Sequence, residues 1–338
     1  MRILGIANPF LDRTLHIAEI PKDLKKDGTA YLEKGASSAT FVKEEVEYLW
    51  KKYNTNEDFK WSLGGSGTNV VMALSCLINC FVKESSCALF GMVGKDKKEE
   101  VASQLKNFPI ESRLVEGNAD NGIVNCFVTP DSERTMQAYV GVSDELSKEH
   151  IHPDHFEKVS HVHLEGYLAY LKDVLNFSAL TAKEKGATTS LDLSSTKLIE
   201  DCGDQLKECA AKVDIIFGNL EEMITFTGCK EEKSICDYFS KEQIVVITNG
   251  AKGGWFKDKN TTKVVEFNAI ETKNVIDTTG AGDFFTAGFL AGFLAKKDIE
   301  SSIKIATLAA SYVIQQDGTK LPNERWEELQ KQAEKISR

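Results

Sequence analysis

A glycine-rich string in the last quarter of the chain combines an anion-binding turn with a carboxylate. It reads DTTGAGD, from Asp277 to Asp283, and leads into the helix-like run FFTAGFLAGFLA. Backbone N–H groups converge at such a helix start, so Gly280, Ala281 and Gly282 are predicted to bind an anion such as phosphate. Asp283 lies beside those amides, where a carboxylate can accept the proton of an attacking hydroxyl. The alternative is an ordinary loop in which Asp283 caps the helix.

A second glycine-rich string and an early aspartate are candidates for holding a polyhydroxylated ligand. The string GGSGTN, which ends at Asn69, precedes the apolar run VVMALSCLINCF. Gly64 and Gly65 let a ligand approach the backbone closely, and the Asn69 amide offers both a donor and an acceptor. Asp12 follows the first strand-like run, at the carboxyl end where open α/β sheets place ligands. A flexible turn capped by Asn69 and a turn-forming Asp12 are the alternatives.

Two further strings follow strand-like runs in the C-terminal half. NLEE, from Asn219 to Glu222, follows DIIFG and has the spacing of a helix capping box. Its functional alternative is a Mg²⁺ site that acts through water, because Mg²⁺ keeps much of its hydration shell. TNGAKGG, from Thr248 to Gly254, has small residues that admit a flat ligand, with a hairpin turn as the alternative. No one of the four strings decides the chemistry alone.

Strand-like and helix-like segments alternate along most of the chain, which predicts an α/β protein with a mostly parallel sheet. The β-rich apolar runs are 3–7, 87–93, 159–164, 188–193, 213–217 and 244–248. Apolar residues recur at intervals of three and four, as in amphipathic helices, within 69–82, 97–107, 174–185, 299–314 and 324–336.

Two regions depart from this alternation. Residues 14–38 and 113–141 look like strands with polar faces, and the turn-like PDSE interrupts the second. Because the two regions are alike in character, we expect them to pair into a small sheet that projects from the main body and closes as a lid. No repeat, low-complexity tract or linker-like stretch is present. The sequence therefore predicts a single domain over residues 1–338, with the lid as an insertion.

The composition is that of a globular protein. Apolar residues at 42% and charged residues at 27% exclude disordered, collagen-like and disulfide-scaffold classes. The 41 basic and 51 acidic residues give a net charge of -10, which disfavours nucleic acid and anionic membranes as partners. The eight cysteines contain no CxxC pair, the apolar windows are too short to cross a bilayer, and MRILGIANPF lacks signal-peptide features. We therefore expect reduced thiols and a cytoplasmic location.

The order of the strings resembles that of the ribokinase, or PfkB, superfamily of sugar and nucleoside kinases. GG-x-x-x-N at 64–69, N-x-x-E at 219–222 and DTTGAGD at 277–283 stand in family order and at family-like distances. No GxxxxGK[ST] loop and no GxGxxG string competes with this assignment. The stretches that look like the adenosine kinase branch are GIANPFLD, GGSGTN, VTPDSERTM, LEGYL, LDLS, DIIFGNLEE, DTTGAGDFFTAGFL and AASYVIQQDGTKLP. The resemblance implies a ribokinase-like fold, in which helices flank a central, mostly parallel sheet and a small β-sheet forms a lid.

The resemblance also implies a role for each matched residue. Asp283 would be the catalytic base and the turn 280–282 the anion hole, while Asn219 and Glu222 would lie at the Mg²⁺–phosphate region. Arg134, on the lid, matches an arginine that reaches the transferring phosphate. The residues matched to the ribose hydroxyls are Asp12, Gly64, Gly65 and Asn69. Those matched to the ATP are Asn219, Thr248 and Gly250.

The activity that the resemblance implies is ATP-dependent phosphorylation of a nucleoside, with adenosine first and a role in purine salvage. Inosine or guanosine, and the free sugars ribose or fructose, are the alternative acceptors, and a non-catalytic nucleotide-binding protein is the remote one. Mg²⁺ is implied as cofactor, and a requirement for a monovalent cation such as K⁺ is left open. A lid that closes over its own site favours a monomer, whereas a lid whose edge strands pair with a partner favours a homodimer; of the two we expect the monomer.

Histidines gather in one segment, EHIHPDHFEKVSHVH, which ends at His163. Their spacing resembles that of metal ligands, and His161 and His163 would share a strand face. Because Pro153 breaks the segment and nothing in the family resemblance needs a metal there, we do not expect a zinc site.

Overall fold

A large sheet forms the centre of the computed structural model, which describes residues 1–20, 37–38, 41–54, 59, 61–131 and 134–336. Within this described part the sheet has nine strands. Their order is β14 (Val264–Phe267), β13 (Gly254–Lys257), β12 (Ile244–Thr248), β11 (Ile215–Asn219), β10 (Thr188–Asp192), β9 (His161–Glu165), β1 (Arg2–Ile6), β5 (Ser86–Gly94) and β6 (Ile110–Gly117). Neighbours run parallel except at β12–β13 and β13–β14, which are antiparallel. The predicted mostly parallel α/β architecture is confirmed.

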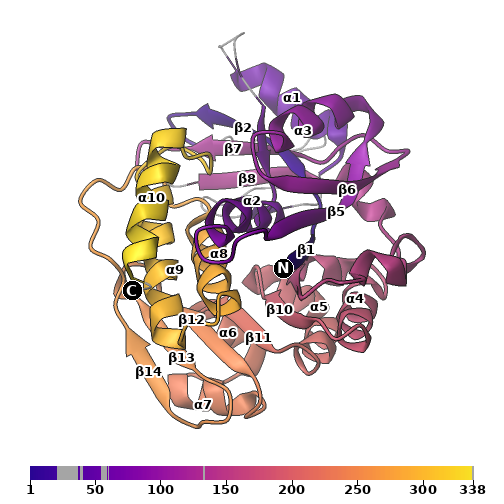
Figure 1. Cartoon of the computed structure of the whole chain (residues 1–338). Helices are drawn as coiled ribbons and strands as arrows, with labels where there is room; N and C mark the ends of the chain where they lie inside the picture. The colour runs from indigo at the N-terminus through magenta and orange to yellow at the C-terminus, as the bar shows by residue number, and fades with distance from the viewer. Residues whose placement is uncertain (21–36, 39–40, 55–58, 60, 132–133, 337–338) are drawn as a thin grey trace.

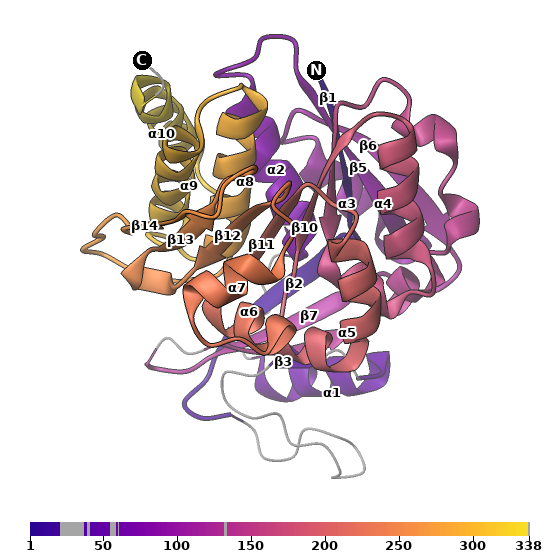
Figure 2. The same ribbon diagram turned by 90° about the horizontal axis from the view of Figure 1, so that it is seen from below.

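Helices cover both faces of this sheet, as the apolar runs require, because strands buried on both sides have few polar positions. One face is covered by α2 (Ser66–Ile78), α3 (Lys98–Leu105), α8 (Ala281–Leu294), α9 (Ile299–Val313) and α10 (Asn323–Ile336). The other is covered by α4 (Val174–Glu184), α5 (Thr196–Ala210), α6 (Leu220–Thr227) and α7 (Glu232–Tyr238). Figure 2 shows the two helical layers on opposite sides of the strands.

The strand order reverses next to β1. From β1 the chain builds β5 and β6 on one side, and later β9 to β12 on the other. Such a reversal opens a crevice at the carboxyl ends of the strands, which is where open α/β sheets bind ligands. The register brings polar residues to that edge, because Glu165 pairs with Asp192 and Asn219 pairs with Thr248.

A second, small sheet lies apart from the large one, beside α1 (Lys43–Tyr53) in Figure 1. Its order is β3 (Ser37–Ser38), β8 (Arg134–Tyr139), β7 (Ile123–Val128), β2 (Phe10–His16) and β4 (Ser62–Gly64). Strand β2 pairs with β7 and β3 pairs with β8, so the two polar-faced regions do meet in one small sheet, as predicted. Apolar side chains of α1, such as Leu49 and Trp50, pack with Phe127 in a separate small core.

The predicted boundaries of the small sheet are partly wrong. Residues 113–117 belong to β6, which pairs with β5 at the edge of the large sheet. Its polar positions arise because an edge strand has one open side, a pattern that also suits a lid strand. The small sheet also begins earlier, at Phe10, and includes β4. Residues 21–36 of the first predicted region lie outside the described residues, and closure of the sheet as a lid stays a prediction.

Helix α8 is apolar on nearly all sides because it is enclosed by α2 and α9 and packs on the sheet. Its aromatic residues Phe284, Phe285 and Phe289 are buried, so the run FFTAGF is helix core, as predicted. All eight cysteines are free thiols, of which Cys76, Cys80 and Cys229 are only partly buried. Within the described ranges, no helix has the length and apolar character needed to cross a bilayer.

Candidate active site

The two glycine-rich strings meet at the carboxylate of Asp283. Gly280 precedes α8 with φ 75°, a backbone conformation that favours glycine, and Asp283 follows in the first turn. The Asp283 Oδ1 atom accepts a hydrogen bond from Ser66 Oγ at 2.7 Å, and Oδ2 accepts one from Asn69 Nδ2 at 2.8 Å. Both donors lie on the first turn of α2, which begins after Gly65. The carboxylate is therefore held in one orientation at the start of α8.

The environment of Asp283 suits a general base. Burial raises the pKa of Asp283 to about 7, and the hydrogen bonds from Asn69 and Ser66 act in the opposite direction. A base is most effective when its pKa lies near the working pH. The structure therefore brings Asp283, Asn69 and the turn 280–282 together, and adds Ser66, whose role the sequence did not indicate.

Asp12 lies on β2 of the small sheet, against the glycine of the neighbouring strand β4. A Cβ at Gly64 would overlap the Asp12 carboxylate, so a side chain at this position would displace that carboxylate. Burial raises the pKa of Asp12 to about 7, opposed by the charges of Arg134 and Lys320. The buried Oδ1 atom of Asp12 has no hydrogen-bond partner among the described residues. This oxygen is therefore free to accept a hydrogen bond from a ligand hydroxyl.

Asn219 and Glu222 form a helix capping box, which is the structural one of the two interpretations that the sequence left open. Asn219 Oδ1 accepts from the Glu222 N–H at 2.9 Å, and Glu222 Oε2 accepts from the Asn219 N–H at 2.8 Å. Glu222 is buried, and burial together with the charge of Asp192 raises the pKa of its carboxyl group. A capping role does not exclude ligand binding, because Asn219 itself is exposed at the carboxyl edge.

Two carboxylates at the ends of β9 and β10 were missed by the sequence reasoning. Burial raises the pKa of Glu165 to about 8, and its Oε2 atom has no partner within the described part of the chain. Asp192 Oδ2 accepts a hydrogen bond from Thr286 Oγ1 of α8 at 3.4 Å. Both residues lie in quoted stretches, LEGYL and LDLS, and the available signal was an acidic residue that ends an apolar strand.

Arg134 of the small sheet contacts the start of the DTTGAGD string. Its Nη2 atom lies 2.8 Å from Asp277 Oδ2 and 3.3 Å from Asp317 Oδ1. The same Asp277 oxygen accepts a hydrogen bond from the Gly318 N–H at 2.8 Å. Arg134 is thus brought to the predicted phosphate region, where its guanidinium group is engaged by carboxylates of the chain.

The connection between α9 and α10 reaches the site through residues to which the sequence gave no role. Thr319 Oγ1 lies 3.2 Å from Asn69 Oδ1. Lys320 Nζ donates to Gln104 Oε1, and the lysine charge lowers the pKa of Asp12. This segment is part of the quoted stretch AASYVIQQDGTKLP, but its contacts lie too far away in sequence to be predicted from local patterns.

The remaining predicted residues lie in two turns. Gly282 is exposed at the start of α8, while the Ala281 N–H donates to Thr278 O at 3.2 Å. Thr248 ends β12, and Gly250 lies in the hairpin turn that leads to the antiparallel strand β13. The hairpin alternative describes the conformation of this string, and its place along ATP stays a prediction.

The buried histidines of β9 are linked to hydroxyl groups of β10. His161 contacts Thr188 Oγ1 at 2.8 Å and Ser190 Oγ at 2.9 Å, and His163 contacts the same Ser190 Oγ at 2.9 Å. Burial lowers the pKa of His161 to about 3 and of His163 to about 4, so both rings are neutral near pH 7. They share a strand face, as predicted.

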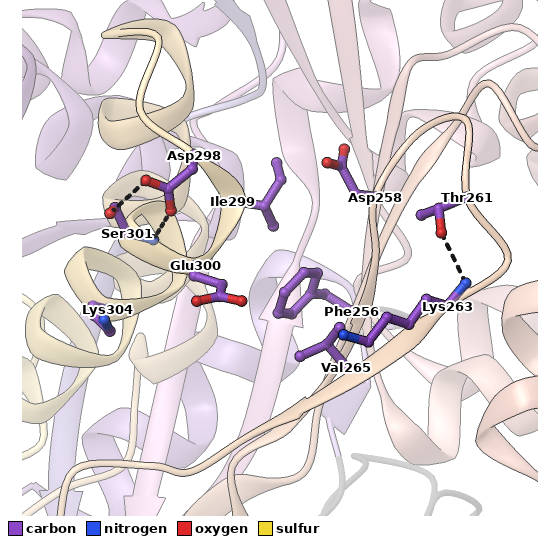
Figure 3. Close-up of a pocket in the computed structure, with 10 residues that line it drawn as sticks. All are labelled: Phe256, Asp258, Thr261, Lys263, Val265, Asp298, Ile299, Glu300, Ser301 and Lys304. Carbon is purple, nitrogen blue, oxygen red and sulfur yellow. Dashed lines mark hydrogen bonds between the residues drawn. The ribbon is translucent and has the colours of Figure 1, made fainter.

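A cavity of about 440 Å³ lies between the β13–β14 hairpin and the start of α9. Figure 3 shows Phe256, Val265 and Ile299 in it, with Glu300 nearby and Asp298 turned to Ser301. The Asp298 side chain caps α9 by accepting from the Ser301 N–H at 2.7 Å. None of the predicted site residues lines this cavity, and it lies at the end of β12 opposite the carboxyl edge.

Comparisons with known proteins agree with this geometry. Residues 38–326 match the model of the pfkB family carbohydrate kinases. The chain is 27% identical to an ATP-dependent ribose-1-phosphate kinase of Halopiger xanaduensis, over 76% of this chain and 82% of the relative. It is 23% identical to an adenosine kinase of Saccharomyces cerevisiae, over 78% of this chain and 80% of the relative.

The fold has close counterparts among solved structures. An adenosine kinase from Sinorhizobium meliloti superposes with a TM-score of 0.83 and 24% identity, over 98% of both chains. Together with the large, mostly parallel sheet and the small second sheet of this chain, this likeness shows the ribokinase-like fold expected from the motifs. The chain therefore belongs to the pfkB family of carbohydrate kinases, and it is a phosphotransferase that acts, with ATP as phosphoryl donor, on a hydroxyl group of a sugar or nucleoside.

Proposed function

We propose that the chain is a nucleoside kinase whose preferred acceptor is adenosine, with AMP and ADP as products. The observation that carries the proposal is the Asp283 carboxylate, fixed by Ser66 and Asn69 at the start of α8. The unpartnered oxygen of Asp12 supports recognition of a polyhydroxylated acceptor beside that base. The likeness to relatives named adenosine kinase supports the choice of acceptor.

In this proposal the residues of the chain supply a base and an anion site. Asp283 accepts the proton of the primary hydroxyl as its oxygen attacks the γ-phosphorus of ATP, and the bond to the bridging oxygen breaks to release ADP. N–H groups of the turn 280–282 would stabilise charge on the transferring phosphoryl group. The Arg134 guanidinium, which lies against Asp277 of the same string, supplies positive charge near this point.

The chain also offers a region that fits Mg²⁺. Burial raises the pKa of Glu222 and of Asp192, and the charge of Asp192 raises the pKa of Glu222 further, so a divalent cation nearby would stabilise the ionised forms. Asn219 adds an amide at the same edge and pairs with Thr248 across β11 and β12. Bound there, Mg²⁺ would neutralise phosphate charge on ATP, and Thr248 and Gly250 would lie along the nucleotide.

A second candidate is phosphorylation of a sugar or sugar phosphate. The charges of Arg134 and Lys320 both act on Asp12, so the acceptor end of the site carries two cations that a neutral nucleoside does not need. A relative is named ribose-1-phosphate kinase, which agrees with an anionic acceptor. Free ribose, fructose, inosine and guanosine remain further alternatives.

One experiment separates these acceptors. Initial rates of ADP formation from ATP are measured with adenosine, inosine, guanosine, ribose, fructose and ribose 1-phosphate, each with and without Mg²⁺ and K⁺. We expect the highest kcat/KM with adenosine, because a pocket that pairs with a purine edge rejects analogues that lack it. A higher kcat/KM with ribose 1-phosphate or a free sugar than with every nucleoside would replace adenosine as the acceptor. Sedimentation of the same sample tests the expected monomer against a homodimer.

A further inference from the structure

Thr319 lies behind the proposed base, in the connection between α9 and α10. It is 8% exposed, and its Oγ1 atom lies 3.2 Å from Asn69 Oδ1. Its methyl group packs against the turn that precedes α8, because a Cβ at Gly280 would lie 2.5 Å from Thr319 Cγ2. One side chain therefore contacts both glycine-rich strings, and no motif in the sequence assigns it a role.

A chain of two hydrogen bonds links Thr319 to the base. Asn69 Nδ2 donates to Asp283 Oδ2 at 2.8 Å, which leaves Asn69 Oδ1 on the side of Thr319. An ionised carboxylate accepts but cannot donate, so only the amide nitrogen of Asn69 can face Asp283 in its active form. The Thr319 hydroxyl must then be the donor to Asn69 Oδ1. Thr319 thus favours the amide orientation that the ionised base needs.

Neighbouring residues hold Thr319 in place. The Gly318 N–H donates to Asp277 Oδ2 at 2.8 Å, and Asp317 Oδ1 lies 3.3 Å from the Arg134 guanidinium. The segment is thereby tied to the DTTGAGD string and to the small sheet just before Thr319. A hydroxyl held by a fixed backbone loses little freedom when it forms its hydrogen bond, so it can select one orientation of the amide.

We propose that Thr319 is a positioning residue for phosphoryl transfer, whose hydroxyl holds the Asn69 amide in the orientation that donates to the Asp283 carboxylate. The proposal rests on the proposed role of Asp283 as base. It goes beyond that role, because it places part of the control of the base on the connection between α9 and α10, which touches neither reacting group.

The other charged groups around Asp283 make this donor important. The negative charge of Asp192 on β10 raises the pKa of Asp283. The charge of Asp283 in turn raises the pKa of Glu165 on β9 and of Asp12 on β2 of the small sheet. Arg134 and Lys320 act on Asp12. Ser66 and Asn69 are the side-chain donors to the Asp283 carboxylate within the described residues. Loss of the correct Asn69 orientation should therefore raise the pKa of Asp283.

The test compares Thr319→Val with Thr319→Ser in the full-length protein. Valine keeps the shape and removes the hydroxyl, while serine keeps the hydroxyl and removes the methyl group. With the best acceptor of the panel, we expect Thr319→Val to lower kcat about 3- to 10-fold, the range of one hydrogen bond, with smaller changes in either KM. The acid limb of its kcat–pH profile should move up by roughly half a pH unit, and Thr319→Ser should restore both.

A matched control and a second readout complete the test. Thr307 of α9 is also 8% exposed and bonds Lys304 O at 3.1 Å, so Thr307→Val controls for burying a methyl group in place of a hydroxyl. Independently of turnover, the ¹⁵N side-chain amide signal of Asn69, assigned with Asn69→Ala, should titrate with Asp283. Its midpoint should be higher in Thr319→Val and return in Thr319→Ser.

The outcomes separate the two proposals. Equal losses in Thr319→Val and Thr319→Ser, or a wild-type kcat and an unchanged amide midpoint in Thr319→Val, overturn the positioning role. Retained turnover in Asp283→Asn overturns the base instead, and the amide titration still decides whether Thr319 orients Asn69. The proposal is supported if the midpoint of the Asn69 amide titration rises and kcat falls in Thr319→Val but not in Thr319→Ser.

Discussion

The helix-covered body around the large sheet and the small sheet each contribute one aspartate to the site, Asp283 on α8 and Asp12 on β2, and the protein holds the two side chains to different degrees. Burial raises the pKa of Asp283 and of Asp12 alike to about 7. On the body built around the large sheet, both oxygens of Asp283 accept hydrogen bonds from α2. On the small sheet, Asp12 Oδ1 has no partner within the described chain. In the proposed roles, the base Asp283 is therefore positioned before an acceptor arrives, whereas the acceptor-binding residue Asp12 would gain its partner only when a ligand binds.

The sheets also differ in what stabilises them. The large sheet is buried between two layers of apolar helices, so its stability comes mainly from hydrocarbon burial. The small sheet combines a small apolar core against α1 with buried polar contacts, in which Arg13 Nε donates to Asn125 Oδ1 at 2.7 Å and Arg13 Nη2 pairs with Glu47 Oε1 at 3.1 Å. Its contacts with the body near the site are ionic, such as Arg134 with Asp277. Polar contacts can exchange partners at less cost than apolar packing, which would suit the predicted closure of the small sheet.

The largest expected effect is on the body side of this comparison. Asp283→Asn keeps the shape of the side chain and removes the base, so kcat should fall by about 10²- to 10⁴-fold with little change in the KM of the acceptor. Steady-state kinetics with saturating ATP measures both constants. Near-normal turnover in this variant would remove Asp283 from the role of base and with it the contrast between the two aspartates.

On the small-sheet side, Asp12→Asn should act mainly on binding. A hydrogen bond from a ligand hydroxyl to a carboxylate contributes about 1.5–3 kcal/mol, so the KM of the acceptor should rise roughly 10- to 100-fold, while kcat at saturation changes less. Isothermal titration with the acceptor gives an independent measure of affinity. Gly64→Ala is the matched variant, because its Cβ would displace the same carboxylate. A lost kcat with an unchanged KM would place Asp12 among the groups that act only in the transition state.

The comparison also explains what the sequence could predict. Asp283, the turn 280–282 and Asn69 could be singled out because they lie in short strings whose chemistry depends on local spacing, and in the structure Asn69 contacts Asp283. The contact of Thr319 with Asn69 joins residues 250 positions apart, so no local pattern encodes it. Glu165 was open to prediction, because an acidic residue that ends a buried strand must either be paired or face a ligand.

Errors in the predicted small sheet have a related cause. Strand β6 has a polar face because it is the edge of the large sheet, and a polar-faced strand of a lid would show the same alternation. Pairing partners decide between the two, and they are set by the path of the whole chain. Arg134 shows a second limit of prediction from local sequence patterns. The sequence placed it on the lid, but its ion pair with Asp277 depends on tertiary packing.

An intermediate effect is expected where the small sheet contacts the loops of the body, at Arg134. Arg134→Ala should lower kcat about 5- to 10-fold and change the KM of the acceptor less, because the cation acts mainly in the closed, reacting state. Asp317→Asn removes only the longer and more exposed of the two ion pairs of Arg134, so we expect a smaller loss of kcat than in Arg134→Ala. Hydrogen exchange of β7 and β8 with and without acceptor tests closure directly. Unchanged kcat would leave Arg134 a structural residue, and identical exchange would argue against a lid.

The smallest expected effect is on stability, and it sharpens the comparison because it needs no ligand. Glu165 on the large sheet has its pKa raised by burial from 4.5 to about 8. The folded state therefore binds this proton more tightly than the unfolded state, so the contribution to stability is complete below pH 4.5 and is lost as the pH rises through 8. Glu165→Gln removes the charge and should flatten the fall in Tm between pH 5.5 and 8.5, with a gain of about one to a few degrees at the upper end.

Asp12→Asn should also flatten the fall in Tm with rising pH, but over a lower pH range, because the pKa of the Asp12 carboxyl group in the folded state is about 7. Thermal melts of the ligand-free protein at half-unit pH steps measure both curves. Since Asp12 belongs to the small sheet, whose contacts with the body are polar, its flattening should be weaker in the global Tm than that of Glu165, which is buried within the large sheet. Parallel curves of Tm against pH for the wild type and Glu165→Gln would contradict this expectation. They would mean that a partner already neutralises Glu165, so that the carboxyl edge of the large sheet holds no carboxylate that burial destabilises and a ligand could stabilise.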